Sequence, residues 1–366
     1  MSEWKEYKLG EVINLKRGYD LPNALRKTGS IPIISSSGIT DYHNEAMKKA
    51  PGVITGRYGT IGQVFFSSED YWPLNTTLYV QDFKGNYPKF IFYLLKNFDF
   101  AKYSDKSAVP GINRNDVHTE DVIIPNVKEQ IQIASVLSSL DDKIDLLHRQ
   151  NKTLEQLAET LFRQWFVEEE WSGSLSEYAK VQGGYAFKSK DFKANGFAGV
   201  IKIRNISMGI IDIRNSDFVE ESVVKNLDQR FKIKSGDFLI AMTGAEIGKI
   251  GIVEKTEKEI WLNQRVGKLE ARVPYGNIIG YLALKSREGQ DHITNACAGS
   301  AQENISTTGI EEMSFASYDS AKANSFGVES QPLFEKIIFN HNQIRTLTQL
   351  RDTLLPKLMS GELRVS

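Results

Sequence analysis

Histidines and a glycine-rich turn are the residues of this sequence whose types could support catalysis. Residues 244–250 resemble a phosphate-binding loop, but the spacing to Gly248-Lys249 is one residue short, and Ile250 stands where the loop needs a hydroxyl. No methyltransferase cofactor loop and no paired-carboxylate nuclease motif is recognisable. The sequence therefore predicts neither a catalytic residue nor a metal site, because no metal-ligand spacing links the five histidines, His43, His118, His148, His292 and His341.

Length and composition are typical of a globular protein with two domains or a duplicated one. The chain has 366 residues, of which 41% are hydrophobic and 25% charged. Net charge is −1, but residues 129–171 hold four basic and nine acidic residues, so the rest is slightly basic and permits DNA binding. No apolar run approaches the roughly 18 residues of a membrane span. Because Cys297 is the single cysteine, we expect a cytoplasmic protein.

An internal repeat divides the chain. Its later half aligns without gaps at an offset of 193 residues, as His148 with His341 and Leu154 with Leu347 show. Its earlier half matches more loosely, and the offset drifts upward from 166 to 188, which predicts insertions in the second copy. We interpret this as one scaffold that carries two different readers; a duplication without functional consequence is the alternative. The looser matches are Gly18-Tyr19 with Gly184-Tyr185, and Leu74-Asn75 with Leu262-Asn263 behind Trp72 and Trp261.

Two long helices are predicted where the repeat is strictest. Residues 129–167 contain neither Gly nor Pro, and Asn126 with Glu129 supplies a start signal. The second helix is predicted to start near Ser330 and Pro332 and to end at Pro356 and Gly361. Apolar residues alternate at spacings of three and four, as in a coiled-coil seam. The seam residues are Leu137, Leu140, Ile144, Leu147, Asn151, Leu154, Leu333, Ile337, Asn340, Ile344, Leu347 and Leu354.

Each seam contains one asparagine, Asn151 or Asn340. If the two face each other in an antiparallel pair, the numbers of facing residues sum to 491. A buried asparagine pair fixes the register of a coiled coil at some cost in stability. The alternative is that both side chains face solvent, and a distance well beyond side-chain contact would exclude the pair. The other layers would be Leu137–Leu354, Leu140–Arg351, Ile144–Leu347, Leu147–Ile344, Leu154–Ile337 and Ala158–Leu333.

The two diverged segments mix short strands with one or two helices. Residues 51–62 and 236–248 each predict a strand, a glycine turn and a second strand. Helices are predicted at residues 89–97 and 278–287. Each segment therefore predicts an α+β domain of modest size.

Six segments together form a recognisable set. They are residues 4–11 (WKEYKLGE), 38–43 (GITDYH), 74–80 (LNTTLYV), 111–114 (GINR), 123–144 and 358–363 (LMSGEL). In these segments, and over nearly its whole length, the chain resembles the specificity subunits of type I restriction-modification systems. One departure is that the second copy lacks the proline-rich lead-in to its helix and has residues 326–330 (FGVES) instead.

The resemblance implies an α+β fold in which two long helices separate two pseudo-repeated α/β target-recognition domains. The domains are expected at residues 1–128 and 172–328, each reading one half of a split, asymmetric site in double-stranded DNA. The helices, in residues 129–171 and 329–366, are expected to form an antiparallel coiled coil that docks two methyltransferase subunits. A translocating nuclease subunit completes the enzyme. S-adenosylmethionine, ATP and magnesium act in those partners, so no cofactor is expected in this chain.

For DNA contact we favour polar loop residues near the matching points of the repeat. Arg and Asn make bidentate contacts with base edges, whereas Lys more often holds phosphates. Each candidate is at least as well explained as a solvated surface residue, and Asn75 and Asn263 as structural residues. The candidates are Lys16, Arg17, Arg57, Tyr58, Asn75, Lys106 and Arg114 in the first domain, and Lys188, Lys190, Arg204, Asn205, Asn263, Gln264 and Arg265 in the second.

Two rival interpretations remain open: a duplicated coiled-coil adaptor that binds only proteins and, less favoured, an unrecognised nuclease. A split motif with a fixed gap, selected from random DNA, would favour the specificity subunit. DNA hydrolysis by the isolated chain would favour the nuclease. The target itself is not predicted, because base specificity depends on loop shape and DNA deformation.

Overall fold

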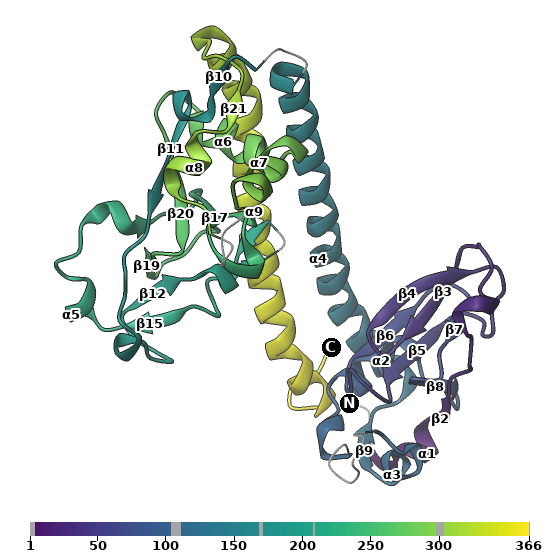
Figure 1. Ribbon diagram of the computed structural model, residues 1–366. Helices are drawn as coiled ribbons and strands as arrows, with labels where there is room; N and C mark the ends of the chain where they lie inside the picture. The colour runs from purple at the N-terminus through teal and green to yellow at the C-terminus, as the bar shows by residue number, and fades with distance from the viewer. Residues whose placement is uncertain (1–3, 104–110, 168–170, 208, 298–303, 366) are drawn as a thin grey trace. The chain divides into compact units, whose positions relative to one another are not determined.

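The computed structural model describes residues 4–103, 111–167, 171–207, 209–297 and 304–365 (Figure 1). The chain divides into two compact units, the first made of residues 1–143 and 347–366 and the second of residues 144–346. Each unit includes part of both long helices, α4 (Val127–Phe162) and α9 (Ser320–Met359). Within the described ranges, no helix is long and apolar enough to cross a membrane.

The first unit is built around a four-stranded antiparallel sheet of order β2–β8–β5–β6. A second sheet has the order β4–β3–β7, and β1 pairs with β9. Helix α2 packs its apolar face into the same core as α4 and the end of α9. The strands are β1 (Lys5–Lys8), β2 (Asn14–Arg17), β3 (Ile31–Ser35), β4 (Gly38–His43), β5 (Gly52–Gly56), β6 (Val64–Ser67), β7 (Trp72–Pro73), β8 (Thr77–Asp82) and β9 (Asp121–Ile124); the short helices are α1 (Leu9–Val12), α2 (Pro88–Lys96) and α3 (Arg114–His118).

The second unit repeats this plan with additions. Its larger sheet has the order β11–β20–β17–β18–β14–β13, its smaller sheet β15–β12–β19–β16, and β10 pairs with β21. The strands are β10 (Gly173–Ser174), β11 (Ala179–Gly183), β12 (Ala198–Ile201), β13 (Ile206–Ser207), β14 (Ile210–Ile211), β15 (Asp217–Val219), β16 (Lys232–Ile233), β17 (Phe238–Ala241), β18 (Ile250–Ile252), β19 (Glu259–Leu262), β20 (Val266–Ala271) and β21 (Ser314–Phe315); the helices are α5 (Glu221–Val224), α6 (Gly276–Lys285), α7 (Arg287–Cys297) and α8 (Thr307–Glu311).

The strand pairing shows that the two units share one topology. The run β2–β8–β5–β6 matches β11–β20–β17–β18, and the parallel pair β3–β7 matches β12–β19. The extra elements β13, β14, α5 and β16 lie between β12 and β17, so the predicted insertions in the second copy are confirmed. The helices predicted at residues 89–97 and 278–287 are α2 and α6. After β5 and β17 the next strands begin at Val64 and Ile250, beyond the predicted ranges 51–62 and 236–248. The intervening residues form turns that contain the positive-φ glycines Gly59, Gly62, Gly244 and Gly248.

Helix α4 agrees with the first predicted helix, because it continues beyond Phe162 as a π-helical turn, Arg163–Val167. The predicted start of the second helix is wrong by about ten residues. Helix α9 begins at Ser320, where the Asp319 carboxylate accepts from the backbone N–H groups of Ala321 and Lys322 at 2.8 and 3.1 Å.

Tertiary packing explains why Gly327 does not delay the start of α9. A Cβ at Gly327 would lie 1.9 Å from the Tyr275 ring, so the glycine lets this ring lie against the helix. The neighbouring Phe326 is buried and packs against Phe166 with ring centroids 5.2 Å apart. At the other end, α9 continues through Pro356 to Met359, and Gly361 follows with a φ of 74°.

The predicted asparagine pair is confirmed. Asn340 Nδ2 donates to Asn151 Oδ1 at 2.8 Å, and both side chains are buried. In the same unit, Phe162 contacts Phe326 with ring centroids 6.2 Å apart, so later residues of α4 meet earlier residues of α9 and the helices are antiparallel. Within the first unit, Arg351 pairs with Asp141 at 2.9 Å, in keeping with the same direction.

The remaining seam residues are all at least half-buried. Leu140 is half-buried and adjoins Asp141, the partner of Arg351. The layer Ile144–Leu347 stays a prediction, because its two residues belong to different units. Leu137, Ile144, Leu147 and Ile337 are buried; Leu154, Leu333, Ile344, Leu347 and Leu354 are half-buried.

In the second unit, α9 also contacts the sheet and α6, which lie beside it (Figure 1). Phe334 packs edge-on against Phe238 of β17 and Tyr281 of α6, with ring centroids 5.4 and 5.5 Å apart. This segment of α9 therefore has two apolar faces, one toward α4 and one toward the domain.

Candidate DNA interface

A glycine sets the backbone at the end of β2 and at the end of β11. A Cβ at Gly18 would lie 2.1 Å from the carbonyl oxygen of Leu74, and a Cβ at Gly184 would lie 2.2 Å from that of Asn263. No side chain fits in either place, which explains why Gly-Tyr recurs in the repeat. The preceding residue, Arg17, is thereby held at the end of β2.

Arg57 and Tyr58 follow β5 and are held by neighbouring chain segments. Arg57 N–H donates to the carbonyl of Thr76 at 2.8 Å, and the Arg57 carbonyl accepts from Ile112 N–H at 3.0 Å. The guanidinium carbon of Arg57 lies 4.4 Å from the centroid of the Tyr58 ring, a cation–π contact. A Cβ at Gly111 would lie 2.1 Å from that ring, so glycine makes room for it.

These segments form an open cavity of about 430 Å³ in the first unit. It brings together four of the predicted DNA-contacting residues, namely Arg17, Arg57, Tyr58 and Arg114. Arg17 lies 3.6 Å from a carboxylate oxygen of Asp20. For Arg57 and Arg114, the described part of the chain places no carboxylate within ion-pair distance. Among the described residues, the cavity therefore presents two guanidinium groups without a carboxylate partner, the donors that suit phosphates and guanine edges. The other lining residues are Leu78, Gly111, Ile112 and Asn113.

The other candidates of the first unit lie outside this cavity. Lys16 is half-buried on β2 opposite Tyr79. Asn75 donates to the Asp20 carboxylate, which gives it a structural contact. Lys106 lies outside the described residues. Asn113, which is not among the predicted contacts, also lines the cavity; its side chain accepts from Asn115 N–H and caps α3, and in the sequence it adjoins Arg114.

In the second unit, two of the candidates are structural. Asn205 is buried, accepts from Lys202 N–H at 2.9 Å and donates to the Asp212 carbonyl at 3.0 Å. Asn263 is buried as well, and its side chain accepts from Arg265 N–H at 3.4 Å. Neither side chain is available to DNA in this structure. Arg204 is exposed but pairs with Asp217 at 2.7 Å, while Lys188, Lys190, Gln264 and Arg265 are exposed.

Backbone hydrogen bonds correct the sequence match between the two copies by one residue. Leu74 N–H donates to the Ile34 carbonyl, and Asn263 N–H donates in the same way to the Ile201 carbonyl. Strand pairing, rather than the shared Leu-Asn dipeptide, sets the register. The matched pairs are therefore Leu74 with Asn263, Asn75 with Gln264, and Thr76 with Arg265.

The cavity residues can be matched in the same way, and their chemistry differs between the units. Ile112 N–H donates to the Arg57 carbonyl, and Ile305 N–H donates to the Met242 carbonyl, so Met242 occupies the position of Arg57. Arg265 supplies a cation from the position of Thr76. The second unit therefore has the same backbone arrangement at the matching positions, but fewer arginines there. The remaining matches are Arg17 with Gly183, Tyr58 with Thr243, Asn113 with Ser306 and Arg114 with Thr307.

A half-buried side-chain acceptor for the strand that precedes the Gly-Tyr pair also recurs. Leu15 N–H of β2 donates to His118 Nε2 at 3.0 Å, and Val181 N–H of β11 donates to the Glu311 carboxylate at 2.8 Å. Burial, with Arg114 and Lys84 nearby, lowers the pKa of His118, which keeps Nε2 free to accept. Sequence reasoning missed this pair because a histidine and a glutamate share no motif.

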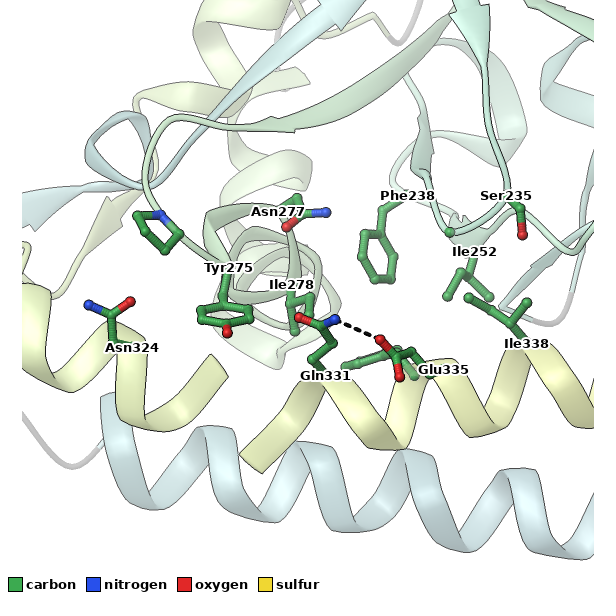
Figure 2. Close-up of a pocket in the computed structure, with 13 residues that line it drawn as sticks. Ser235, Phe238, Ile252, Tyr275, Asn277, Ile278, Asn324, Gln331, Glu335 and Ile338 are labelled. Carbon is green, nitrogen blue, oxygen red and sulfur yellow. Dashed lines mark hydrogen bonds between the residues drawn. The ribbon is translucent and has the colours of Figure 1, made fainter. Parts of the chain in front are cut away.

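A second cavity, of about 550 Å³, lies in the second unit between α9, α6 and β17 (Figure 2). Its floor is apolar, with Phe238, Ile252 and Ile338. The only charged residue that lines it is Glu335, which accepts from Gln331 at 2.6 Å. Because a carboxylate repels phosphates, this cavity does not suit the DNA backbone. Among the described residues, no group of three His, Cys, Asp or Glu side chains could hold a metal ion.

Comparison with known proteins shows which family this chain is similar to. The family model of the type I restriction modification DNA specificity domain matches residues 1–156 and 168–316. The HindI specificity subunit of Haemophilus influenzae is 23% identical, with 99% of this chain and all of that protein aligned. The MjaIX specificity subunit of Methanocaldococcus jannaschii is 26% identical over 80% of this chain and 74% of that protein.

A solved structure shares the fold. The S subunit of a type I restriction-modification system from M. genitalium superposes with a TM-score of 0.66 at 17% identity, over 98% of this chain and 96% of that one. The family match covers the strand-rich part of both copies and most of α4, including the segments that form the arginine-lined cavity. The chain therefore belongs to the type I restriction-modification specificity subunits, the non-catalytic subunits that recognise the DNA target.

Proposed function

We propose that this chain reads a split, asymmetric DNA target with two domains, residues 1–128 and 172–328, one for each half of the target. The support is one backbone frame that carries different side chains: three arginines line the cavity of the first domain, and Gly183, Met242 and Thr307 stand in their places in the second. Because base contacts come from side chains, two such domains select different bases. The segments 129–171 and 329–366 connect them and hold partner subunits.

The proposal for partner binding rests on exposed apolar residues that recur at matching positions of the two long helices. Leu146 and Leu157 of α4 are 40% and 45% exposed and lie 11 residues apart, about three helical turns. At the offset of 193 residues, α9 presents Phe339 and Leu350, which are 52% and 45% exposed. Single exposed apolar side chains are common on protein surfaces, so it is their recurrence at matching positions of the two helices that supports a protein interface here. The same pattern on both helices suits two copies of one partner.

The partner that fits this repetition is the methyltransferase subunit of the restriction-modification complex, in two copies. S-adenosylmethionine would act there, and ATP and magnesium would act in the nuclease subunits that join the complex. We place none of these cofactors in this chain, whose contribution is to position the partners on the target.

A selection experiment tests target reading. The chain, together with its methyltransferase subunit, is incubated with random duplex DNA, and the bound pool is sequenced. We expect two short motifs with a fixed gap between them. A pool without any motif would favour the protein-only adaptor, and cleavage of DNA by the isolated chain would favour the nuclease.

Substitutions on the helices test partner binding. Leu146→Asp and Phe339→Asp should each reduce the number of bound methyltransferase subunits from two to one, and the double variant should bind none, as measured by mass photometry. Lys152→Asp, an exposed position of the same helix about 120° around its axis from Leu146, is the control and should retain two. Full binding by the double variant would contradict this assignment.

A further inference from the structure

Arg57 differs from the other two arginines of the cavity, Arg17 and Arg114, in how firmly its side chain is held. Both its backbone polar groups are hydrogen-bonded, to Thr76 and Ile112, and its guanidinium is stacked on Tyr58. The residue is half-buried, whereas Arg17 and Arg114 are exposed. A stacked guanidinium loses little further freedom when it binds, and its planar fork can donate two parallel hydrogen bonds.

A fixed side-chain geometry matters more for an arginine that contacts a base than for one that contacts a phosphate. A phosphate accepts hydrogen bonds from many directions, so mobile surface arginines serve it well. Guanine offers O6 and N7 side by side in the major groove, and a correctly placed arginine contacts both. Among base edges, these two acceptors match the fork of arginine, whereas adenine presents a donor beside its N7.

Within the target-reading role proposed above, we propose that Arg57 reads a guanine in the half of the target that the first domain binds. Tyr58 is the positioning residue that orients the guanidinium plane. Arg17 and Arg114, at the rim of the same cavity, contact phosphates on either side of this base. The recognised feature is the O6/N7 edge of a guanine.

The second domain does not share this reader. Met242 occupies the position of Arg57 and cannot donate a hydrogen bond, and Thr243 replaces the aromatic ring of Tyr58. Arg265, at the position of Thr76, enters from a different segment and has no stacking partner among the described residues. A guanine that depends on Arg57 therefore belongs to one half of the target only.

The test uses the full chain in complex with its methyltransferase subunit and the DNA selected by the native complex. Three variants are compared: Arg57→Met, which installs the residue of the second copy; Arg57→Lys, which keeps the charge and removes the fork; and Arg114→Thr. Each is given a fresh selection and a salt titration of binding. Circular dichroism and thermal unfolding check that each variant is folded, and Arg57→Lys keeps the test usable if Arg57→Met is not.

We expect Arg57→Met to lose the preference for guanine at one position of one half of the target, and Arg57→Lys to weaken it, because an ammonium can reach O6 or N7 without the planar fork. Binding of Arg57→Met to the native target should fall by about 10- to 100-fold, and the other half should stay unchanged. Replacement of that guanine by 7-deazaguanine, which lacks N7, should weaken the native complex and not the Arg57→Met complex. Arg114→Thr should instead weaken binding to all sequences and reduce the salt slope by about one.

Tyr58 gives a second readout. Tyr58→Phe keeps the ring and should keep the guanine preference, whereas Tyr58→Ala should weaken it without changing the salt slope. If Arg57→Met and Arg57→Lys select the same motif as the native chain, Arg57 does not read a base and the inference is overturned. If the native complex selects no motif at all, the proposed function itself fails, which is a separate result.

Discussion

The buried pair Asn151–Asn340 allows a double-mutant cycle in the second unit. In the single variant Asn340→Leu, Asn151 keeps a buried amide whose oxygen has lost its donor. An unsatisfied buried polar group costs about 1–3 kcal/mol, so the free energy of unfolding should fall by that amount. The same loss is expected for Asn151→Leu. In the double variant no amide remains, and the two leucines form an apolar layer like its neighbours.

The double variant should therefore be more stable than either single variant by about 1–3 kcal/mol, because both partners have been replaced together. Urea unfolding followed by tryptophan fluorescence measures this. Trp165 and Trp261 belong to the second unit, and replacement of Trp4 and Trp72 by phenylalanine in all four proteins removes the signal of the first. If the two single losses simply add in the double variant, the asparagines act independently and the reasoning is refuted.

Substitutions of His341, His118 and Gly327 test three further contacts. Burial, and then the nearby His148, lowers the pKa of His341 to about 4. The unfolded chain gains its proton near pH 6.5, so stability should fall between pH 6.5 and 4 by about 3 kcal/mol more in the native chain than in His341→Gln; parallel pH curves would contradict this. His118→Gln, which keeps an acceptor for Leu15 N–H, should lose less stability than His118→Leu, which should lose about 1–3 kcal/mol in urea unfolding. Gly327→Ala should lower the melting temperature, although alanine favours a helix more than glycine does, because the added Cβ would meet the Tyr275 ring; an unchanged or higher melting temperature would contradict this.

Helix pairing was predictable because it is local and periodic. A seam at spacings of three and four needs only the sequence of one helix, and the single asparagine in each seam selects one register from many. The start of α9 was not predictable in this way. Gly327 and Pro332 are helix breakers when read locally, yet Gly327 is required by the Tyr275 ring and Phe326 by the aromatic core, which are both tertiary contacts.

The candidate interface was predictable in part for a related reason. Arg17 and Arg57 lie at the ends of β2 and β5, and Arg114 lies two residues after Ile112, which recurs as Ile305. Marking the matching points of the repeat therefore selected residues that the fold brings to one cavity. The same rule selected Asn205 wrongly, because a local turn directs the Asn205 amide inward, where it donates to the Asp212 carbonyl. Asn75 was wrongly matched with Asn263 because the match relied on identical residue types. Strand pairing, which sets the register between the two copies, matches Leu74 with Asn263 instead.

The first unit is discontinuous in the chain, and this has a consequence for synthesis on the ribosome. Residues 144–346 are contiguous and can complete the second unit as soon as they have emerged. The first unit needs Leu355, Leu358 and Met359 in its core, and Arg364 lies over the Trp4 ring with its guanidinium carbon 5.3 Å from the ring centroid. The segment made first is therefore finished last, and it waits with apolar surface uncovered while about 200 further residues are translated. Chaperone demand should accordingly fall on the amino-terminal domain of a nascent chain.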